Sequence, residues 1–220
     1  MFGARRKNSA WDLEALEMAT RAGLHRAGAA VLTGLLAQPG AHGARVACAC
    51  GEQAHHHDHR PKRLLTALGP IEFERAYFIC PHCHQGYSPR DRELDVEGTE
   101  CSPGVRRMLA LVGSESSFEQ GREQLELLAG IEVTAKAVER QAEAIGADIA
   151  ARMRYPIFRA QGLFVGSGVV EAGCKTVVAT RLKRSGMFWT VGGANAIIAL
   201  RSCRLSGRFE DYWEARSPAA

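Results

Sequence analysis

Two close pairs of cysteines constrain this chain of 220 residues more than any other feature of its sequence. One residue separates Cys48 from Cys50, and two separate Cys80 from Cys83. Between the pairs, apolar runs at 64–68 and 71–79 flank Gly69-Pro70, which predicts a β-hairpin with its turn at this dipeptide. Zinc prefers four tetrahedral ligands, so we expect one structural zinc ion on Cys48, Cys50, Cys80 and Cys83. The alternative is that the four are buried free thiols.

The remaining cysteines and histidines give weaker signals. Cys101, Cys174 and Cys203 have no close partner in the sequence, and we expect them to be small core residues. The run His55-His-His-Asp-His59 is expected to form a polar loop that binds metal adventitiously, with a specific metal site as the less favoured alternative. His82 and His84 lie beside the second cysteine pair and could replace one of its ligands.

Hydrophobic periodicity predicts helices on both sides of the cysteine-rich segment. A long amphipathic helix is expected over 9–37, capped by Ser9 and stopped by Gln38-Pro39-Gly40. Its simplest role is packing or dimerisation. Three more helices are expected over 103–113, 117–129 and 134–145, with a capping box at the start of the second and glycines ending each.

The last two of these helices have the layout of a helix-turn-helix. Leu125 and Leu128 are predicted to face inward from the first, and Val138 and Ile145 from the second. The start of the second helix would then meet DNA through Thr134, Lys136 and Arg140. Glu139 and Glu143 on the same side oppose this, and an ordinary helical hairpin is the alternative.

The net charge of +4 is unevenly distributed. Residues 151–220 hold 11 Lys and Arg against 4 Asp and Glu, a net +7, which leaves −3 on residues 1–150. A basic C-terminal third favours a polyanionic partner such as nucleic acid, and a solvated basic face is the alternative. We expect no membrane span, no secretory signal and a cytoplasmic location.

The segment 166–175 holds one carboxylate, Glu171, within a run of glycines. Its spacing fits neither a Walker A loop, a dinucleotide fingerprint nor a nucleophile elbow, so a nucleotide-binding enzyme is a poor hypothesis. A carboxylate beside basic residues fits Mg²⁺-assisted phosphoryl transfer, but a single Glu is by default a capping or ion-paired residue. The basic residues that follow it are Lys175, Arg181, Lys183 and Arg184.

Taken in order, these segments resemble the DDE transposases of the ISKra type of bacterial insertion sequence. The resemblance rests on Cys48 to Gly51, on Thr66-Ala-Leu-Gly69, and on the motif of Arg75, Tyr77, Cys80 and Cys83. It continues through Tyr87-Ser-Pro-Arg-Asp91, the segment 166–175, Arg181 to Trp189 and Gly193-Ala-Asn. It covers nearly the whole chain.

The resemblance implies an RNase H-like domain with three acidic residues and Mg²⁺, and Glu171 matches the third acid. In the family, a long β-rich stretch carrying the other two acids precedes the 166–175 segment, and here the chain passes to it directly from Asp148-Ile-Ala-Ala-Arg. Asp148 ends a helical pattern and is not accepted as a substitute. One carboxylate cannot hold two metal ions around a scissile phosphate.

We therefore expect an α+β chain in four segments. These are an N-terminal helix (1–42), a zinc-ribbon-like hairpin (43–100), a helix-turn-helix-like region (101–153) and a remnant of the catalytic domain (154–220). Having lost its sheet, the remnant should expose Phe164, Met187, Phe188 and Trp189. The expected function is DNA binding at element ends without strand cleavage, with full-length transposase or a second copy as further partners. The alternative is a zinc-stabilised protein-interaction module with no DNA role.

Overall fold

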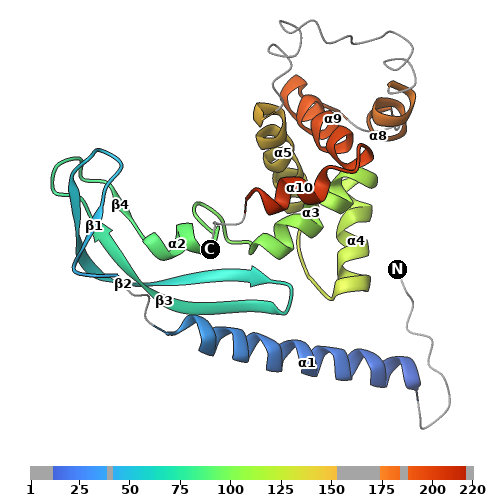
Figure 1. Ribbon diagram of the computed structural model, residues 1–220. Helices are drawn as coiled ribbons and strands as arrows, with labels where there is room; N and C mark the ends of the chain where they lie inside the picture. Colours follow the sequence, from blue (N-terminus) through green and yellow to red (C-terminus); the bar gives the residue numbers. More distant parts are fainter. Residues whose placement is uncertain (1–11, 39–41, 153–173, 184–187, 217–220) are drawn as a thin grey trace, which may run out of the picture. The chain divides into compact units, whose positions relative to one another are not determined.

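The computed structural model describes residues 12–38, 42–152, 174–183 and 188–216 of the chain (Figure 1). The fold is mixed α+β, and the chain divides into two compact units, 1–92 and 93–220. The expected N-terminal helix and most of the expected hairpin segment lie in the first unit. The helical region and the described part of the C-terminal segment lie in the second.

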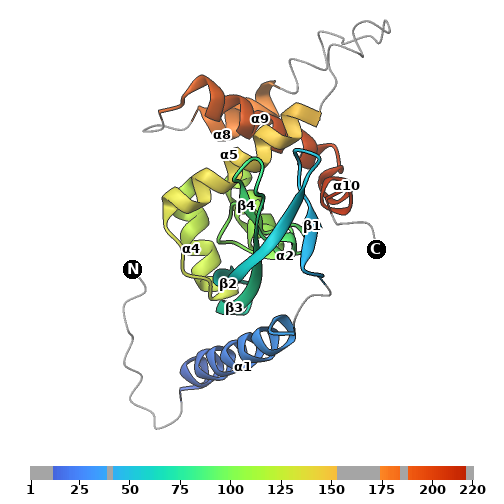
Figure 2. The same ribbon diagram turned by 90° about the vertical axis from the view of Figure 1, so that its left-hand side faces the viewer.

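The first unit is an antiparallel sheet flanked by a long helix. Strands β1 (Arg45–Ala47), β2 (Gln53–Thr66), β3 (Gly69–Ile79) and β4 (Gly86–Tyr87) pair in sequence order. Helix α1 (Leu13–Leu36) lies alongside the β2–β3 hairpin in both views (Figures 1 and 2), with Gly28 against Leu68. The short helix α2 (Pro89–Glu93) follows β4.

The hairpin turn lies two residues earlier than the sequence predicts. Thr66 pairs with Gly69 and Leu65 with Pro70, so Ala67 and Leu68 form the turn and Gly69-Pro70 begins β3. The Thr66 hydroxyl accepts from the amide of Leu68 and donates to the carbonyl of Gly69 at 2.7 Å. Gly69 has φ +109°, a conformation that favours glycine. Pro70 is accommodated at the strand's start.

Helix α1 begins at Leu13, and its N-cap is Asp12, whose carboxylate accepts from the amides of Glu14 and Ala15. Ser9, which the sequence suggests as the cap, lies outside the described residues. Aspartate satisfies the first free amides of a helix as well as serine does. The helix ends at Leu36, one residue before the predicted end, and Ala37 is its C-cap.

The second unit is helical. Its described elements are α3 (Pro103–Glu115), α4 (Phe118–Ala129), α5 (Ala135–Arg152), a π-helical turn η1 (Cys174–Ala179), α8 (Thr180–Leu182), α9 (Val191–Leu205) and α10 (Phe209–Glu214). Ser102 caps α3, and Ser117 with Gln120 forms the predicted capping box of α4. Gly130 ends α4 with φ +66°, also as predicted.

Two expectations about α4 and α5 are wrong. Leu125 is buried, but Leu128 is 75% exposed, because α4 turns only a narrow face to its neighbours. Helix α5 continues past Gly146 to Arg152. Gly146 lies inside the helix because α9 crosses there, and a side chain would overlap the backbone of Ala196.

The C-terminal helices have a packing partner. Ile197 and Leu200 of α9 and Trp213 of α10 share one core with Ala142 and Ile145 of α5. Trp189 is half-buried and contacts Phe118 edge-to-face, contrary to the expectation that it is exposed. Phe188 is fully exposed, as expected, while Phe164 and Met187 lie outside the described residues.

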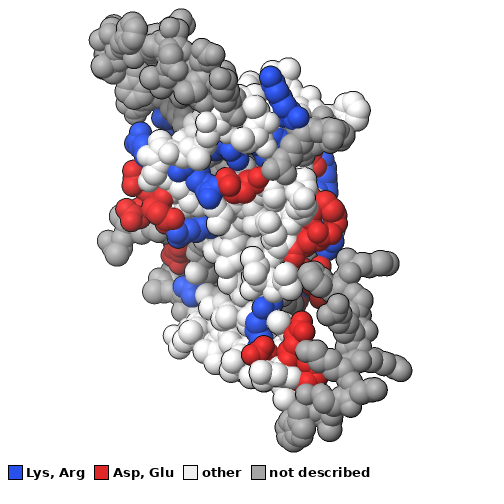
Figure 3. All heavy atoms as spheres, turned by 90° about the vertical axis from the view of Figure 1, so that its right-hand side faces the viewer, with Lys and Arg blue, Asp and Glu red and all other residues white. Residues whose placement is uncertain are grey.

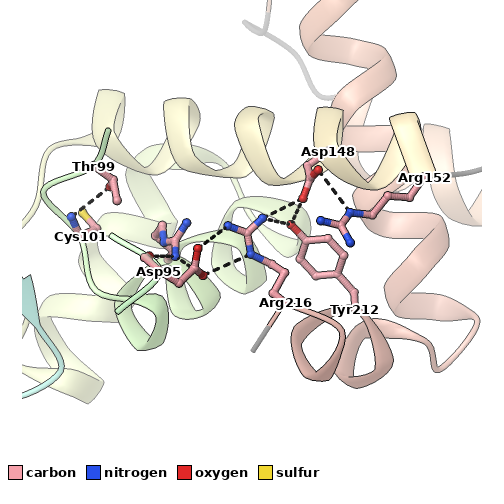
Figure 4. Close-up of polar contacts among 8 residues, drawn as sticks. Asp95, Thr99, Cys101, Asp148, Arg152, Tyr212 and Arg216 are labelled. Carbon is pink, nitrogen blue, oxygen red and sulfur yellow. Dashed lines mark hydrogen bonds and ion pairs between the residues drawn. The ribbon is translucent and has the colours of Figure 1, made fainter. Parts of the chain in front are cut away.

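Polar contacts fasten the end of the chain to this core (Figure 4). Arg216 donates to Asp148 at 2.8 Å and to Asp95 at 3.0 Å, and the Tyr212 hydroxyl donates to Asp148 at 2.7 Å. Burial raises the pKa of the Asp148 carboxyl, but hydrogen bonds from Tyr212 and Arg152 outweigh it, so the net shift is downward. Burial, reinforced by the hydrogen bond to Asp148, raises the pKa of Tyr212 to about 12.

Within the described part of the chain, no helix combines the length and the apolar character needed to cross a bilayer.

Candidate metal centre and candidate nucleic-acid interface

The four cysteines predicted to bind zinc converge at one end of the sheet. Their sulfur atoms all lie within 4.8 Å of one another. The Sγ atoms of Cys48 and Cys83 are 3.6 Å apart, as are those of Cys50 and Cys80. Four sulfurs around a zinc ion at Zn–S distances near 2.3 Å stand about 3.8 Å from each other. The cluster could therefore bind a metal ion such as zinc with little rearrangement.

Each cysteine pair lies in a tight turn between two strands. In the first, the amide of Cys48 donates to the carbonyl of Glu52 and that of Gly51 to the carbonyl of Cys48, and Gly51 has φ +92°. In the second, the amide of His84 donates to the carbonyl of Cys80, and His84 has φ +57°. Such turns direct backbone N–H groups at the cysteine sulfurs, which supports the thiolate form.

The pKa values of the thiols differ according to their donors. The amide of Cys83, with that of His82, lowers the pKa of Cys80 to about 7. The amide of Glu52 lowers the pKa of Cys50, but burial and the neighbouring thiols raise it to about 12. Without metal, the cluster therefore resists full ionisation, and a divalent cation is the natural source of compensating charge.

The phenol of Tyr87 fixes the cysteine turns to each other. Its hydroxyl donates to the carbonyl of Ala47 at 2.5 Å and so links β4 to β1. Its ring packs with Cys48 and Cys83 against buried Phe78. No periodic pattern predicts this contact, although Tyr87 belongs to one of the motifs that carry the resemblance.

The histidines have a different setting from the one expected. Residues 55–59 belong to strand β2 and are not a loop, because they pair with residues 76–79 of β3 on either side of a register shift at His57. His82 and His84 are exposed and are not among the converging ligands.

Thr134, Lys136 and Arg140 lie at the start of α5, directly after the turn from α4. The Thr134 hydroxyl accepts from the amide of Ala137 and so caps the helix. Lys136 and Arg140 are exposed, one turn apart, and Lys136 pairs with Glu139 at 2.8 Å. Val138 and Ile145 are buried on the opposite side, as predicted.

Several arginines of the basic C-terminal third form hydrogen bonds or ion pairs within the second unit. Arg181 is fully buried and donates to the carbonyl of Gly113, so the expectation that it binds DNA is not met in this structure. Arg201 is also buried and donates to backbone carbonyls of η1, and Arg204 pairs with Glu115. A count of charges in the sequence therefore overstates the positive charge on the surface.

One face of the molecule carries charges of both signs. On the face in Figure 3, Lys and Arg side chains are interspersed with Asp and Glu around an uncharged area. Lys183 is exposed. Glu171, Arg184 and the side chain of Lys175 lie outside the described residues, so the structure places none of these predicted site residues.

No protein-family model matches the chain, and no curated protein matches it either.

Proposed function

We propose that this chain is a zinc-stabilised DNA-binding protein derived from a DDE transposase of the ISKra type and unable to cleave DNA. The observation that carries the proposal is the convergence of Cys48, Cys50, Cys80 and Cys83, which belong to two of the motifs on which the family resemblance rests. Zinc would cross-link the two turns and hold β1 and β4 on the hairpin. Four thiolates leave no open position, so its role is structural.

The DNA-binding part of the proposal rests on α4 and α5. The two helices are joined by a short turn, and the N-terminal end of α5 is exposed with Lys136 and Arg140 on one side. A helix N-terminus with cations nearby attracts phosphate. Glu139, already paired with Lys136, reduces this attraction, so we expect modest affinity.

The contacts of Asp148 support the loss of catalysis. Both of its oxygens are occupied, Oδ2 by Tyr212 and Arg216 and Oδ1 by Arg152. A carboxylate held in this way serves to anchor the C-terminal helix and is not available as a ligand for Mg²⁺. Glu171 is then the one family acid that the sequence retains, and strand cleavage needs more.

A gel shift tests the proposal. DNA from the element ends and scrambled DNA are compared at low and moderate salt, with the zinc-loaded chain. Lys136→Ala/Arg140→Ala should weaken binding about tenfold or more and flatten its salt dependence. Arg107→Ala/Arg208→Ala removes the same charge from exposed positions elsewhere in the unit and should have little effect. Equal loss in both variants, or Mg²⁺-dependent nicking that Glu171→Ala abolishes, would contradict the proposal.

A second candidate function is a protein-interaction module, and α1 is the observation that favours it. None of the 24 residues of this helix is buried, although its outer face carries Leu13, Leu24, Val31 and Leu35, each more than half exposed. Leu24 and Val31 are seven residues apart, the spacing of a coiled-coil seam. Pairing with α1 of a second copy would cover this face. Light scattering after size exclusion should then show a dimer that Leu24→Glu dissociates and Ala22→Glu does not.

A further inference from the structure

A bulge in strand β2 changes the direction of two histidines. Alternate residues of a strand point to opposite faces, so His56 and His59, three positions apart, would face opposite ways in a regular strand. The pairing shifts by one residue between His56, opposite Phe78, and Asp58, opposite Tyr77. The extra residue, His57, restores the alternation, and His56 and His59 point to the same face. Their ring centroids are 5.0 Å apart.

These two rings line a cavity of about 440 Å³ within the first unit. A third imidazole, His42, enters from the loop after α1, and Glu74 enters from β3, diagonal to His59 on the same face of the sheet. Glu74 is within the reach expected of a long side chain at a diagonal position. His56 and His42 both stand edge-on to the buried ring of Phe78, at centroid distances of 5.6 and 6.4 Å.

The chemistry of this set suits a transition-metal ion. Imidazole nitrogen with a carboxylate oxygen is a ligand set for Zn²⁺ and its neighbours, whereas the thiolates of the cysteine cluster form a separate site. Two imidazoles on one tetrahedral ion have ring centroids about 5 Å apart, as His56 and His59 have here. The cavity is lined also by Leu36 and Ala37 at the C-terminal end of α1, where the helix dipole favours a cation.

Two arginines also line the cavity and bear on the strength of binding. Arg75 is neutralised by two hydrogen bonds to Asp91. Arg90 also carries a positive charge at the cavity wall, so we expect weaker binding than at the four cysteines.

We propose that His56, His59 and His42, with Glu74, bind a divalent transition-metal ion at a second site independent of the cysteine cluster. Among the described residues, only the four cysteines already have converging ligand atoms, so binding at this second site requires the imidazole and carboxylate side chains to rotate towards a common centre. The site does not depend on the proposed DNA-binding function, because all its ligands lie in the first unit.

The test is metal stoichiometry on the full chain. The protein is stripped of metal, titrated with Zn²⁺ by calorimetry, and the one-zinc form is then titrated with Co²⁺ by absorption. We expect two equivalents of Zn²⁺, the second weaker, and Co²⁺ bands without sulfur-to-metal charge transfer. His56→Ala/His59→Ala should bind one equivalent. His59→Gln, which keeps the size of the side chain, should weaken the second step at least tenfold.

The matched control is His55→Ala/His57→Ala, which removes as many imidazoles from the same strand. His55 points to the opposite face, and His57 is the bulge residue paired with Asp58. This variant should keep both equivalents. Loss of the second equivalent in the control would mean adventitious binding by the histidine run and would overturn the proposal. A wild-type chain that binds one equivalent, or a His56→Ala/His59→Ala variant that binds two, would also overturn it.

Discussion

Gly146 of α5 packs directly on the backbone of Ala196 in α9, and a Cβ atom built on this glycine would overlap the carbonyl group of Ala196. A similar contact joins α3 to α5, where a Cβ on Gly113 would stand 2.6 Å from the Cβ of Ala142. The three helices cross at small residues, which lets their backbones approach closely and bury Leu109, Val138 and Ile197 around the crossings.

The first prediction concerns this crossing. Gly146→Ala should destabilise the second unit by about 1–3 kcal/mol, because the added methyl group forces α9 away from α5. Gly192→Ala in α9 is the matched control, since nothing lies within 4 Å of the position. It should be neutral or stabilising by up to about 1 kcal/mol. Urea unfolding followed by circular dichroism measures both, and equal stability of the two variants would contradict the close contact.

Gly146 also shows where sequence reasoning fails. A glycine after a periodic run is the usual signal for the end of a helix, and the same signal was right at Gly130. What differs at Gly146 is a helix fifty residues later in the chain, which no local pattern reveals. The bulge at His57 is a comparable case, because it depends on pairing with β3.

The cysteine cluster was predictable because zinc ligands can be recognised in a sequence by their residue type and spacing. The hairpin between the cysteine pairs was predictable from two apolar runs that flank a turn-forming dipeptide. Buried Arg181 was not predictable, because an arginine has the same sequence signal whether it faces solvent or donates to a carbonyl inside a core. A count of charged residues gives the net charge of a chain, but it does not show which of the charged side chains lie on the surface.

The second prediction concerns removal of the metal. Chelation, or Cys80→Ser, should unfold the cysteine end of the first unit, because it removes the metal–sulfur bonds that would cross-link the two cysteine turns. Limited proteolysis should then cut around Cys48 and Cys83 while the second unit stays intact. Cys101→Ser, outside the cluster, should keep full metal content. A chelated chain with unchanged protease resistance would show that the four cysteines need no metal to hold their turns.

The third prediction is a pH dependence that arises from Tyr212. Its pKa is raised in the folded chain to about 12, above the value near 10 of an unfolded tyrosine. The Tyr212 phenol therefore stays protonated to a higher pH in the folded state than in the unfolded state. Its contribution to the free energy of unfolding is complete below pH 10 and is lost as the pH rises towards 12. The loss is on the order of 2 kcal/mol for the second unit.

Tyr212→Phe separates this effect from other alkaline titrations. The phenylalanine variant should be less stable than wild type at pH 8, because Asp148 loses a donor, and the difference should shrink above pH 10. Urea unfolding at pH 8, 9, 10 and 11 gives the comparison. A difference that stays constant across this range would exclude the Tyr212–Asp148 hydrogen bond as its source.

The last prediction concerns Arg75 and Asp91, which connect β3 to α2 in the first unit. The guanidinium donates to both carboxylate oxygens, at 2.5 and 3.0 Å, and also to the carbonyl of Arg60, while both side chains are nearly buried. Asp91→Ala leaves the cation of Arg75 without its partner in a position that water reaches poorly. We expect the free energy of unfolding to fall by about 3–5 kcal/mol.

The matched control is Glu72→Ala, which breaks the exposed pair with Arg63 on the same hairpin and should lower the free energy of unfolding by less than about 1 kcal/mol. Because the two variants each remove one carboxylate from the first unit, their thermal unfolding in the zinc-loaded state isolates the effect of burial. Similar melting temperatures would mean that Asp91 is solvated and that the pair does not hold α2 to the sheet.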